Sequence, residues 1–165
     1  MCFVRSGNIY VWSIADDAGD DDVAAKISCR PGALYNRGSC YEFFNSAITW
    51  DSAEEACRNL RPGSQLLSIS SSREERIVSA YIRRYSSSYY VWIGLYAVPH
   101  ANTLKWEWSD RSQYIPGTPL WDGRSPSTSI SSSECVALYT YPSSSARWYQ
   151  QNCDASYPYV CKYKA

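Results

Sequence analysis

Two short stretches in the middle of the chain have hydrophobic patterns typical of β-strands. Residues 91–95 combine aliphatic side chains with Trp92 and carry no charge, which predicts a strand buried on both faces. A buried helix segment could show the same composition, but this stretch is too short for a typical helix and contains Gly94. Residues 106–110 alternate tryptophan with polar residues, which predicts a strand with one buried face. We therefore expect a domain with a β-sheet core.

Two further segments carry apolar residues at helical spacing and have signals for helix ends. The first runs from about Ala47 to Leu60, with Thr49 as its expected N-cap and a Pro-Gly pair soon after it. The second begins at Ser71 or Ser72, and its acidic first turn and basic last turn complement the helix dipole. Shorter patterns predict a hairpin over residues 29–40, a strand over residues 41–44 and a short strand over residues 66–69.

Composition limits the class of protein. The chain has 165 residues, enough for one domain, and its 45% hydrophobic and 19% charged residues exclude a disordered chain. A formal net charge of zero gives no sign of nucleic-acid binding. The sequence contains no apolar run of 18 residues, so no transmembrane segment is predicted. Tyrosine (15) and tryptophan (7) are abundant, which suits a protein that binds glycans or surfaces, although aromatic side chains also simply fill cores.

The seven cysteines indicate an oxidising compartment. They form no CxxC pair, and His100 is the only histidine, so a zinc site with these spacings is not expected. Disulfides are the better interpretation. Six cysteines lie between Cys29 and Cys161, which leaves fifteen possible pairings, and Cys2 is left over.

The N-terminal residues divide into two short segments before the domain. Residues 1–15 end in a small-x-small sequence of the kind that signal peptidase cleaves, but their longest uninterrupted apolar run has only four residues. They are either a truncated secretory signal or a wrongly assigned start. Residues 16–26 contain five aspartates and end in Lys26, which predicts a solvated, disordered segment.

This acidic segment could also be a removable prosegment. Trypsin-like proteases would cut the Lys26–Ile27 bond easily in a flexible segment. Residues 27–165 then carry 14 basic and 11 acidic side chains, a net charge of +3. We thus expect residues 27–165 to form the folded domain. Cleavage would remove the acidic segment and leave a mildly basic protein.

The sequence offers little catalytic chemistry. His100 lies in a loop that contains proline and asparagine, where a solvated histidine is the simpler interpretation. Serine runs at residues 86–88, 131–133 and 143–145 are typical of loops rather than of an activated nucleophile. We therefore do not expect an enzyme, and we expect no cofactor.

Taken with the cysteine positions, the order of predicted elements resembles the C-type lectin-like domain over residues 29–161. Four motifs carry the resemblance: WIGL at 92–95, WEWSD at 106–110, CVAL at 135–138 and YVCK at 159–162. It implies an α+β fold, in which two helices flank two small antiparallel sheets and a long irregular loop runs from Asp110 to Glu134. It also implies three disulfides, which join Cys29 to Cys40, Cys57 to Cys161, and Cys135 to Cys153.

In the family's lectins, the long loop binds calcium and sugar through Glu-Pro-Asn or Gln-Pro-Asp, a Glu near the next Cys, and Trp-Asn-Asp. This chain departs from all three. It has Ser125-Pro126-Ser127 at the first motif, Ser133 at the glutamate position and Tyr149-Gln150 after Trp148. Calcium takes six to eight oxygen ligands, and neutral hydroxyls do not replace carboxylates. We therefore predict no calcium at this loop and no calcium-dependent sugar binding.

Within this superfamily, the sequence is similar to the regenerating-islet (Reg, pancreatic stone protein) group. The shared features are Ile27-Ser28-Cys29 after a basic residue, Ser125-Pro126-Ser127-Thr128, Pro158-Tyr159-Val160-Cys161-Lys162, and an acidic segment before a tryptic site. The similarity implies a secreted, extracellular protein that works without calcium. Members bind bacterial peptidoglycan or mannan, disrupt bacterial membranes, signal growth, or form fibrils after trimming. The avian eggshell lectin-like proteins share much of the pattern and remain an alternative.

One Reg feature is missing from this chain. Some members carry Glu-Pro-Asn between the WIGL and WxW strands, where it is linked to peptidoglycan recognition. The corresponding residues 96–105 form a short loop without an acidic side chain. Peptidoglycan binding by that route is therefore not expected.

Two classes of function follow from these observations. The first is recognition of extracellular glycans or bacterial surfaces, and the candidate ligand-binding residues are Arg124, Ser125, Ser127, Tyr149 and Gln150. For any single one of them, an ordinary loop residue is the simpler interpretation. The second class is a structural matrix, mineral-associated or fibril-forming protein, because a net charge near zero favours self-association into a homo-oligomer or fibril. A mineral binder would need strong acidic patches, which residues 27–165 lack.

Overall fold

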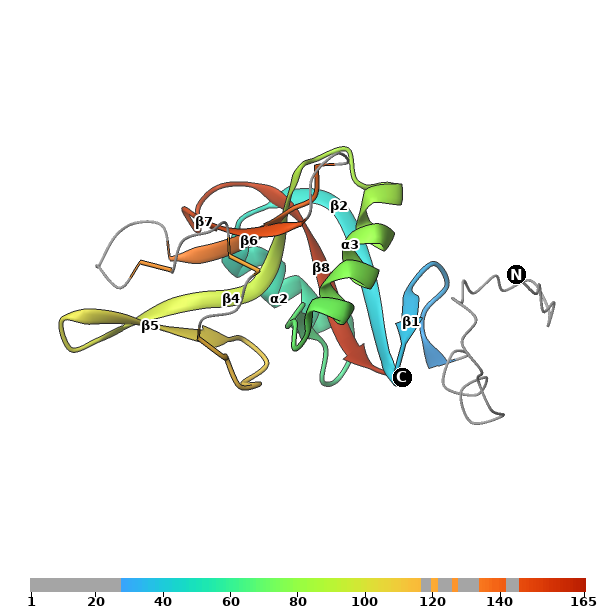
Figure 1. Cartoon of the computed structure of the whole chain (residues 1–165). Helices are drawn as coiled ribbons and strands as arrows, with labels where there is room; N and C mark the ends of the chain where they lie inside the picture. Colours follow the sequence, from blue (N-terminus) through green and yellow to red (C-terminus); the bar gives the residue numbers. More distant parts are fainter. Residues whose placement is uncertain (1–27, 117–119, 122–125, 128–133, 142–145) are drawn as a thin grey trace.

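The computed structural model describes residues 28–116, 120–121, 126–127, 134–141 and 146–165. Within them, two helices lie against a mixed β-sheet (Figure 1). The elements are β1 (Leu34–Asn36), β2 (Ser39–Ile48), α2 (Trp50–Leu60), β3 (Gln65–Leu66), α3 (Ser72–Tyr85), β4 (Tyr90–His100), β5 (Thr103–Trp108), β6 (Cys135–Tyr139), β7 (Arg147–Gln151) and β8 (Tyr157–Lys164). Neither described helix is long and apolar enough to cross a membrane. The predictions for Cys2, Lys26 and Ile27 lie outside the described residues.

The strands form two antiparallel groups that meet at one point. The sheet order is β1-β2-β8-β4-β6-β7, with β3 paired to β8 and β5 paired to β4. All of these pairs are antiparallel except β4 with β8, which meet in parallel at Trp92 and Tyr159. The two small sheets implied by the family resemblance are therefore present, joined through this one residue pair into a continuous sheet.

The strands differ from the predicted segments in their bounds. The strand predicted over residues 106–110 is β5, which begins earlier, at Thr103, and ends at Trp108. The buried stretch 91–95 is the first half of β4, which continues to His100 and forms a hairpin with β5. The strand predicted over residues 66–69 is paired only at Gln65–Leu66, and Leu67 after it bonds to Val160 of β8 and to Gly94 of β4 through its backbone.

Both helices begin at the residue types that the sequence indicated. The Thr49 side chain accepts a hydrogen bond from the Ser52 N–H at the start of α2, so Ala47, which we expected in this helix, belongs to β2 instead. Between the two candidate caps of α3, the structure selects Ser71, whose Oγ accepts from the Glu74 N–H at 3.1 Å. A serine or threonine at this position satisfies one of the unpaired N–H groups at the helix start.

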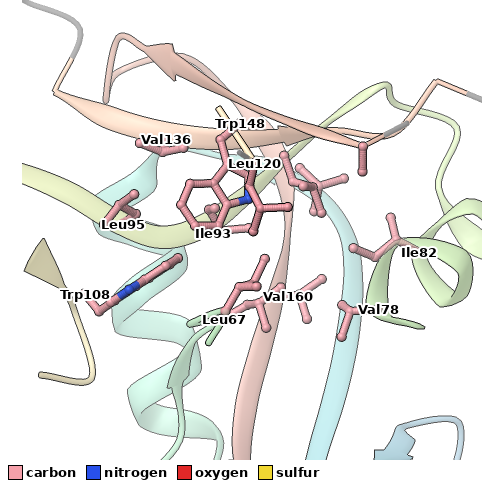
Figure 2. Packing of buried hydrophobic residues seen from close by; sticks show 14 of the residues in the cluster. Leu67, Val78, Ile82, Ile93, Leu95, Trp108, Leu120, Val136, Trp148 and Val160 are labelled. Carbon is pink, nitrogen blue, oxygen red and sulfur yellow. The ribbon is translucent and has the colours of Figure 1, made fainter. Parts of the chain in front are cut away.

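The hydrophobic core lies between α3 and the sheet and continues under the long loop (Figure 2). Val78 and Ile82 of α3 face Leu67 and Val160, as the helical spacing predicted, and Trp148 covers the other end of this core. A second cluster lies on the opposite face of the sheet, where Trp92 packs with α2. The sheet is thus buried on both faces at β4, which explains the continuous apolar run in its sequence.

Gly94 marks a place where three backbone segments approach one another. Its N–H donates to the Leu67 carbonyl and its carbonyl accepts from the Ser109 N–H, both at 2.8 Å. A Cβ atom on Gly94 would lie 2.8 Å from the Leu66 carbonyl oxygen. This position in the strand therefore requires a residue without a side chain.

The three disulfides have the pairing that the family resemblance implied. They join Cys29 to Cys40, Cys57 to Cys161, and Cys135 to Cys153. The second ties α2 to β8 across 104 residues of sequence, and the third ties the start of β6 to the segment after β7. The third disulfide therefore closes the β6–β7 hairpin at the end away from the connection between its strands.

Candidate functional site

The side chains of β7 point alternately to the two opposite faces of the sheet. Trp148 is buried, packs against Trp108 and Trp121, and so faces the core beneath the long loop. Gln150 lies on the same side of the strand, whereas the intervening Tyr149 contacts tyrosines on the other side of the sheet. Successive side chains of a strand point to opposite faces, so these two neighbours in sequence cannot form one surface.

Gln150 fixes a part of the long loop to the sheet. Its Oε1 accepts a hydrogen bond from the Ser127 N–H at 2.9 Å, and the Ser127 carbonyl accepts from Trp106 Nε1 at 3.0 Å. Ser127 is therefore bonded through both of its backbone polar groups, once to β7 and once to β5. This anchor uses only neutral hydrogen bonds.

Among the described residues, those at the family's calcium site do not fit a calcium ion. Of the two that follow Trp148, Tyr149 turns to the opposite face of the sheet, and the carbonyl oxygen of Gln150 already accepts from Ser127. Glu134 is the carboxylate beside Cys135, and in the described ranges no three His, Cys, Asp or Glu side chains come together as a metal site would require. Calcium needs several carboxylate and carbonyl oxygens at once, and this set does not provide them.

Six tyrosines gather on the face of the sheet to which Tyr149 points. We call this group the tyrosine face, and it consists of Tyr89, Tyr90, Tyr139, Tyr141, Tyr149 and Tyr157. Tyr90 is at its centre, with ring centroids 5.1 Å from Tyr139, 6.0 Å from Tyr149 and 5.4 Å from Tyr157. Most of these contacts are tilted or edge-on, which is the geometry that aromatic pairs prefer.

Strand pairing creates the tyrosine face. Tyr90 lies directly opposite Tyr139 in the β4–β6 ladder, and Tyr149 pairs with Ala137, two residues along β6 from Tyr139. Directly opposite and diagonal side chains on one face of a sheet are close enough for aromatic rings to touch. Tyr157, at the start of β8, completes the group from the other side, and its hydroxyl donates to Gln151 Oε1 at 3.1 Å.

The edge of the tyrosine face is open to solvent. Tyr89 is 51% exposed and Tyr141 is 38% exposed, and their rings meet edge-on with centroids 4.8 Å apart. At the buried side, desolvation raises the pKa of Tyr157, and Tyr90 adds to the rise. Such a surface offers flat apolar rings together with neutral hydroxyl groups. It can stack against the apolar face of a sugar ring and donate hydrogen bonds to its hydroxyls.

The structure places the five predicted ligand residues in different surroundings. Ser127 and Gln150 come together at the loop anchor, Tyr149 belongs to the tyrosine face, and Arg124 and Ser125 lie outside the described residues. The sequence reasoning missed the other five tyrosines, which come from three separate segments. The tyrosines at alternate positions 139 and 141 were the available signal, since alternation places two side chains on one face of a strand.

His100 has no catalytic surroundings in the described structure. It is exposed at the end of β4, and its backbone carbonyl accepts a hydrogen bond from Thr103 Oγ1 in the turn to β5. It lies beside the turn of the β4–β5 hairpin.

A family model, related sequences and solved structures all relate this chain to the same group of proteins. The Lectin C-type domain model matches residues 46–163. Human regenerating islet-derived protein 3-gamma is 34% identical over 145 residues, which cover 84% of this chain and 79% of that protein. Mouse lithostathine-1 is 33% identical over 153 residues, which cover 92% of this chain and 88% of that protein.

Solved structures agree with the sequence matches. Human lithostathine superposes with a TM-score of 0.69 at 27% identity and covers 83% of this chain and 100% of its own. Ovocleidin-17, a major protein of the Gallus gallus eggshell calcified layer, superposes with a TM-score of 0.67 at 27% identity and covers 84% of this chain and 100% of its own.

Proposed function

Because this chain belongs to the C-type lectin domain family and is similar to regenerating islet-derived proteins over most of its length, we propose that it is a secreted protein that recognises glycans without calcium. Its ligands are extracellular or bacterial-surface glycans. The tyrosine face is the observation that carries this proposal, because it is the partly exposed surface on which several aromatic rings are already held in fixed positions.

A fixed aromatic surface can bind sugars without a metal ion. A pyranose ring has one face of C–H groups that packs on an aromatic ring, while its hydroxyls bond to polar groups around the ring. Tyrosine provides both kinds of contact with few rotatable bonds, so little conformational entropy is lost on binding. The contacts among the six rings restrict rotation about most of these side-chain bonds before a ligand binds.

Independence from calcium is supported by the anchor at Ser127. In a calcium-binding lectin, the ion would link the long loop to the strand after the tryptophan. Here the Gln150 amide performs that linkage through a neutral hydrogen bond of 2.9 Å. Removal of divalent ions should therefore leave both the loop anchor and the tyrosine face in place.

Secretion and proteolytic activation extend this proposal to the N-terminal residues. Three disulfides are consistent with an oxidising, extracellular environment. Cleavage between Lys26 and Ile27 would remove the five aspartates of residues 16–26 and leave the C-type lectin-like domain at residues 27–165. The family consists in general of binding domains rather than enzymes, and the surroundings of His100 give no reason to depart from that pattern.

The first test is sedimentation of the full chain with insoluble mannan and with peptidoglycan, in calcium and in EDTA. We expect equal binding in both buffers. The variant Tyr89→Ala/Tyr141→Ala should bind about fivefold less or weaker still, because each stacked ring contributes about 0.5–1.5 kcal/mol. Loss of binding in EDTA would contradict the proposed independence from calcium.

Tyr85→Ala is the matched control for the tyrosine face. Tyr85 is 47% exposed, similar to Tyr89, but its ring packs on Tyr81 of α3 outside the face. This variant should bind like the unaltered chain. If both variants lose binding equally, a general effect of exposed tyrosines explains the result, and the tyrosine face is not the site.

A structural role is the second candidate, supported by the likeness to ovocleidin-17 and by the exposed tyrosines. A matrix or fibril-forming protein would use the same aromatic surface to contact another copy of itself. The sedimentation experiment separates the two functions: binding to neither polysaccharide, together with concentration-dependent assembly of the full chain, would favour the structural role.

A further inference from the structure

A pocket of about 550 Å³ lies between the start of α3 and the segment that follows β5. Trp148 is part of its lining, whereas the neighbouring Tyr149 belongs to the tyrosine face. Because adjacent side chains of a strand point to opposite faces of a sheet, the pocket and the tyrosine face lie on different sides of it. A volume of several hundred cubic ångströms is typical of pockets that bind small molecules. This pocket is therefore a second candidate site, separate from the proposed glycan surface.

The floor of the pocket is apolar, and its rim carries neutral polar groups. The rim consists of exposed residues, with serines at 70–72 beside the start of α3 and Ser112 and Gln113 after β5. Ile115 also lies there, and at 62% it is the most exposed large hydrophobic side chain in the described part of the chain. No charged side chain is among the described lining residues, which favours an uncharged ligand. The floor consists of the buried side chains of Ile69, Trp108, Leu120 and Trp148.

Hydrogen bonds hold the two sides of the pocket together in the free protein. Ser68 Oγ donates to the Asp110 carboxylate, and Asp110 Oδ1 accepts from the Ser112 N–H at 2.9 Å. The Ser68 carbonyl accepts from Lys162 Nζ at 2.9 Å. These bonds join the segment after β5 to the segment before α3, and both of them to β8. A pocket that is already formed in this way loses little conformational entropy when a ligand binds.

One polar group in the floor of the pocket has no hydrogen-bond partner. Trp148 is 2% exposed, and among the described residues its Nε1 has no acceptor. A buried N–H without an acceptor is unfavourable, because it has lost its hydrogen bonds to water. Leu120 lies beside this indole (Figure 2) and also lines the pocket. A ligand that moves the Leu120 side chain aside can therefore supply the missing acceptor.

The other indoles show that this fold normally satisfies such a group. Four of them donate from Nε1 to an oxygen atom, at distances of 2.9 to 3.1 Å. These four are Trp50, Trp92, Trp106 and Trp121. The unpaired N–H of Trp148 is thus a property of the pocket.

The floor, the indole and the rim each match one part of a ligand. The apolar floor fits a hydrocarbon chain, the Trp148 N–H fits a carbonyl oxygen, and the rim fits a head with hydroxyl groups. We propose that this pocket binds a neutral lipid in which an ester joins one acyl chain to a hydroxylated head. The ester carbonyl accepts from Trp148 Nε1, and the head bonds to Ser112 and Gln113. A charged head group would find no side chain of opposite charge in the described lining.

The test is a titration of the full chain with 1-monolauroylglycerol below its micelle-forming concentration, followed by ¹H–¹⁵N correlation spectra. We expect the Trp148 indole proton to move downfield as it gains an acceptor, together with shifts of the amides of residues 70–72 and 112–115. The indole proton of Trp92 already has an acceptor on the other face of the sheet and should stay in place. Glycerol alone should cause no shift. An unchanged Trp148 indole proton would overturn the proposal, as would tighter binding of laurate than of the ester.

Ile115→Ser removes a hydrophobic contact from the rim and leaves the core intact, because Ile115 is largely exposed. It should weaken the binding of 1-monolauroylglycerol about fivefold, since a part of the apolar area that the chain covers is lost. Tyr85→Ser is the matched control, because Tyr85 is also an exposed hydrophobic residue but lies outside the pocket. It should change the affinity less than about twofold. Equal losses would show that the lipid adsorbs to any exposed hydrophobic side chain, and would overturn the pocket.

The double variant Tyr89→Ala/Tyr141→Ala separates this site from the proposed glycan surface. It should bind 1-monolauroylglycerol like the unaltered chain, because the tyrosine face lies on the other side of the sheet. A loss of lipid binding in this variant would overturn the placement of the lipid in the pocket. A chain that binds the lipid but neither mannan nor peptidoglycan would refute the proposed function alone, and the reverse result would refute the lipid site alone.

Discussion

Glu74 and Glu75 are neighbours in sequence with opposite electrostatic surroundings. Both are 7% exposed in the first turn of α3. Glu74 accepts hydrogen bonds from Lys162, Tyr41 and Ser70, which lower its pKa against the effect of burial. Burial raises the pKa of Glu75, and the hydrogen bond from Ser79 offsets only a part of that rise. The ionised form of Glu74 therefore stabilises the fold, and the ionised form of Glu75 does not.

This contrast gives a prediction for stability against pH. Because the folded-state pKa of Glu74 lies below 4.5, its stabilising effect is present above that pH and is lost as the pH falls through the lowered value. Glu74→Gln should lower the free energy of unfolding by about 2 kcal/mol at pH 7, since it leaves Lys162 without its charge partner. The variant should also lose less stability below pH 4.5 in urea unfolding.

The adjacent substitution Glu75→Gln is the control. Because folding disfavours the ionised form of Glu75, the free energy of unfolding at pH 7 should stay unchanged or rise. In the unaltered chain, Ser79 Oγ donates to the Glu75 carboxylate at 3.0 Å. The amide oxygen of the introduced glutamine can accept the same hydrogen bond. A loss equal to that of Glu74→Gln would show that any change in the first turn of α3 has the same cost.

At the scale of elements, β7 shows what the sequence could and could not predict. The motif comparison singled out Tyr149 and Gln150 as departures from the family's calcium-site motif. It treated them as one surface, but strand alternation sends them to opposite sides of the sheet. The tyrosine face could not be predicted because it depends on the register of β4 against β6 and of β6 against β7, which no local pattern determines.

The helices and the strand β4 could be predicted because their signals are local. The Thr49 cap, the charges at the two ends of α3 and the apolar run before Gly94 each depend on a few consecutive residues. The bounds of β3 depend on its contacts with β8, which lies nearly a hundred residues later in the sequence. Local reasoning therefore predicted these bounds wrongly. The disulfide pairing came from family resemblance rather than from spacing.

The anchor between β7 and the long loop can be tested directly. Gln150→Ala removes the acceptor of the Ser127 N–H, so hydrogen exchange at the Ser127 amide should become about fivefold faster, as expected for the loss of about 1 kcal/mol of protection. Gln151→Ala, which affects the Tyr157 hydroxyl on the other face, should leave that rate unchanged. Equal rates in both variants would show that Gln150 does not hold the loop.

For the molecule as a whole, the disulfides differ in how much chain they constrain. Cys57–Cys161 closes 104 residues of sequence and Cys29–Cys40 closes 11. In the chain-entropy model, these loops correspond to about 5 and about 3 kcal/mol. We expect Cys57→Ala/Cys161→Ala to lower the free energy of unfolding by about 2 kcal/mol more than Cys29→Ala/Cys40→Ala. Guanidinium unfolding measures this difference, and equal losses would show that local packing dominates at both bridges.

The position of β8 has a consequence for the way the protein folds. This last strand of the chain lies in the middle of the sheet, between β2 and β4, and also pairs with β3. A nascent chain therefore cannot close its sheet until residues 157–164 have left the ribosome. Contacts so distant in sequence are associated with slow folding, on the order of milliseconds to seconds. Until then β2 and β4 have exposed edges, so folding factors would act mainly on this late, strand-completing step.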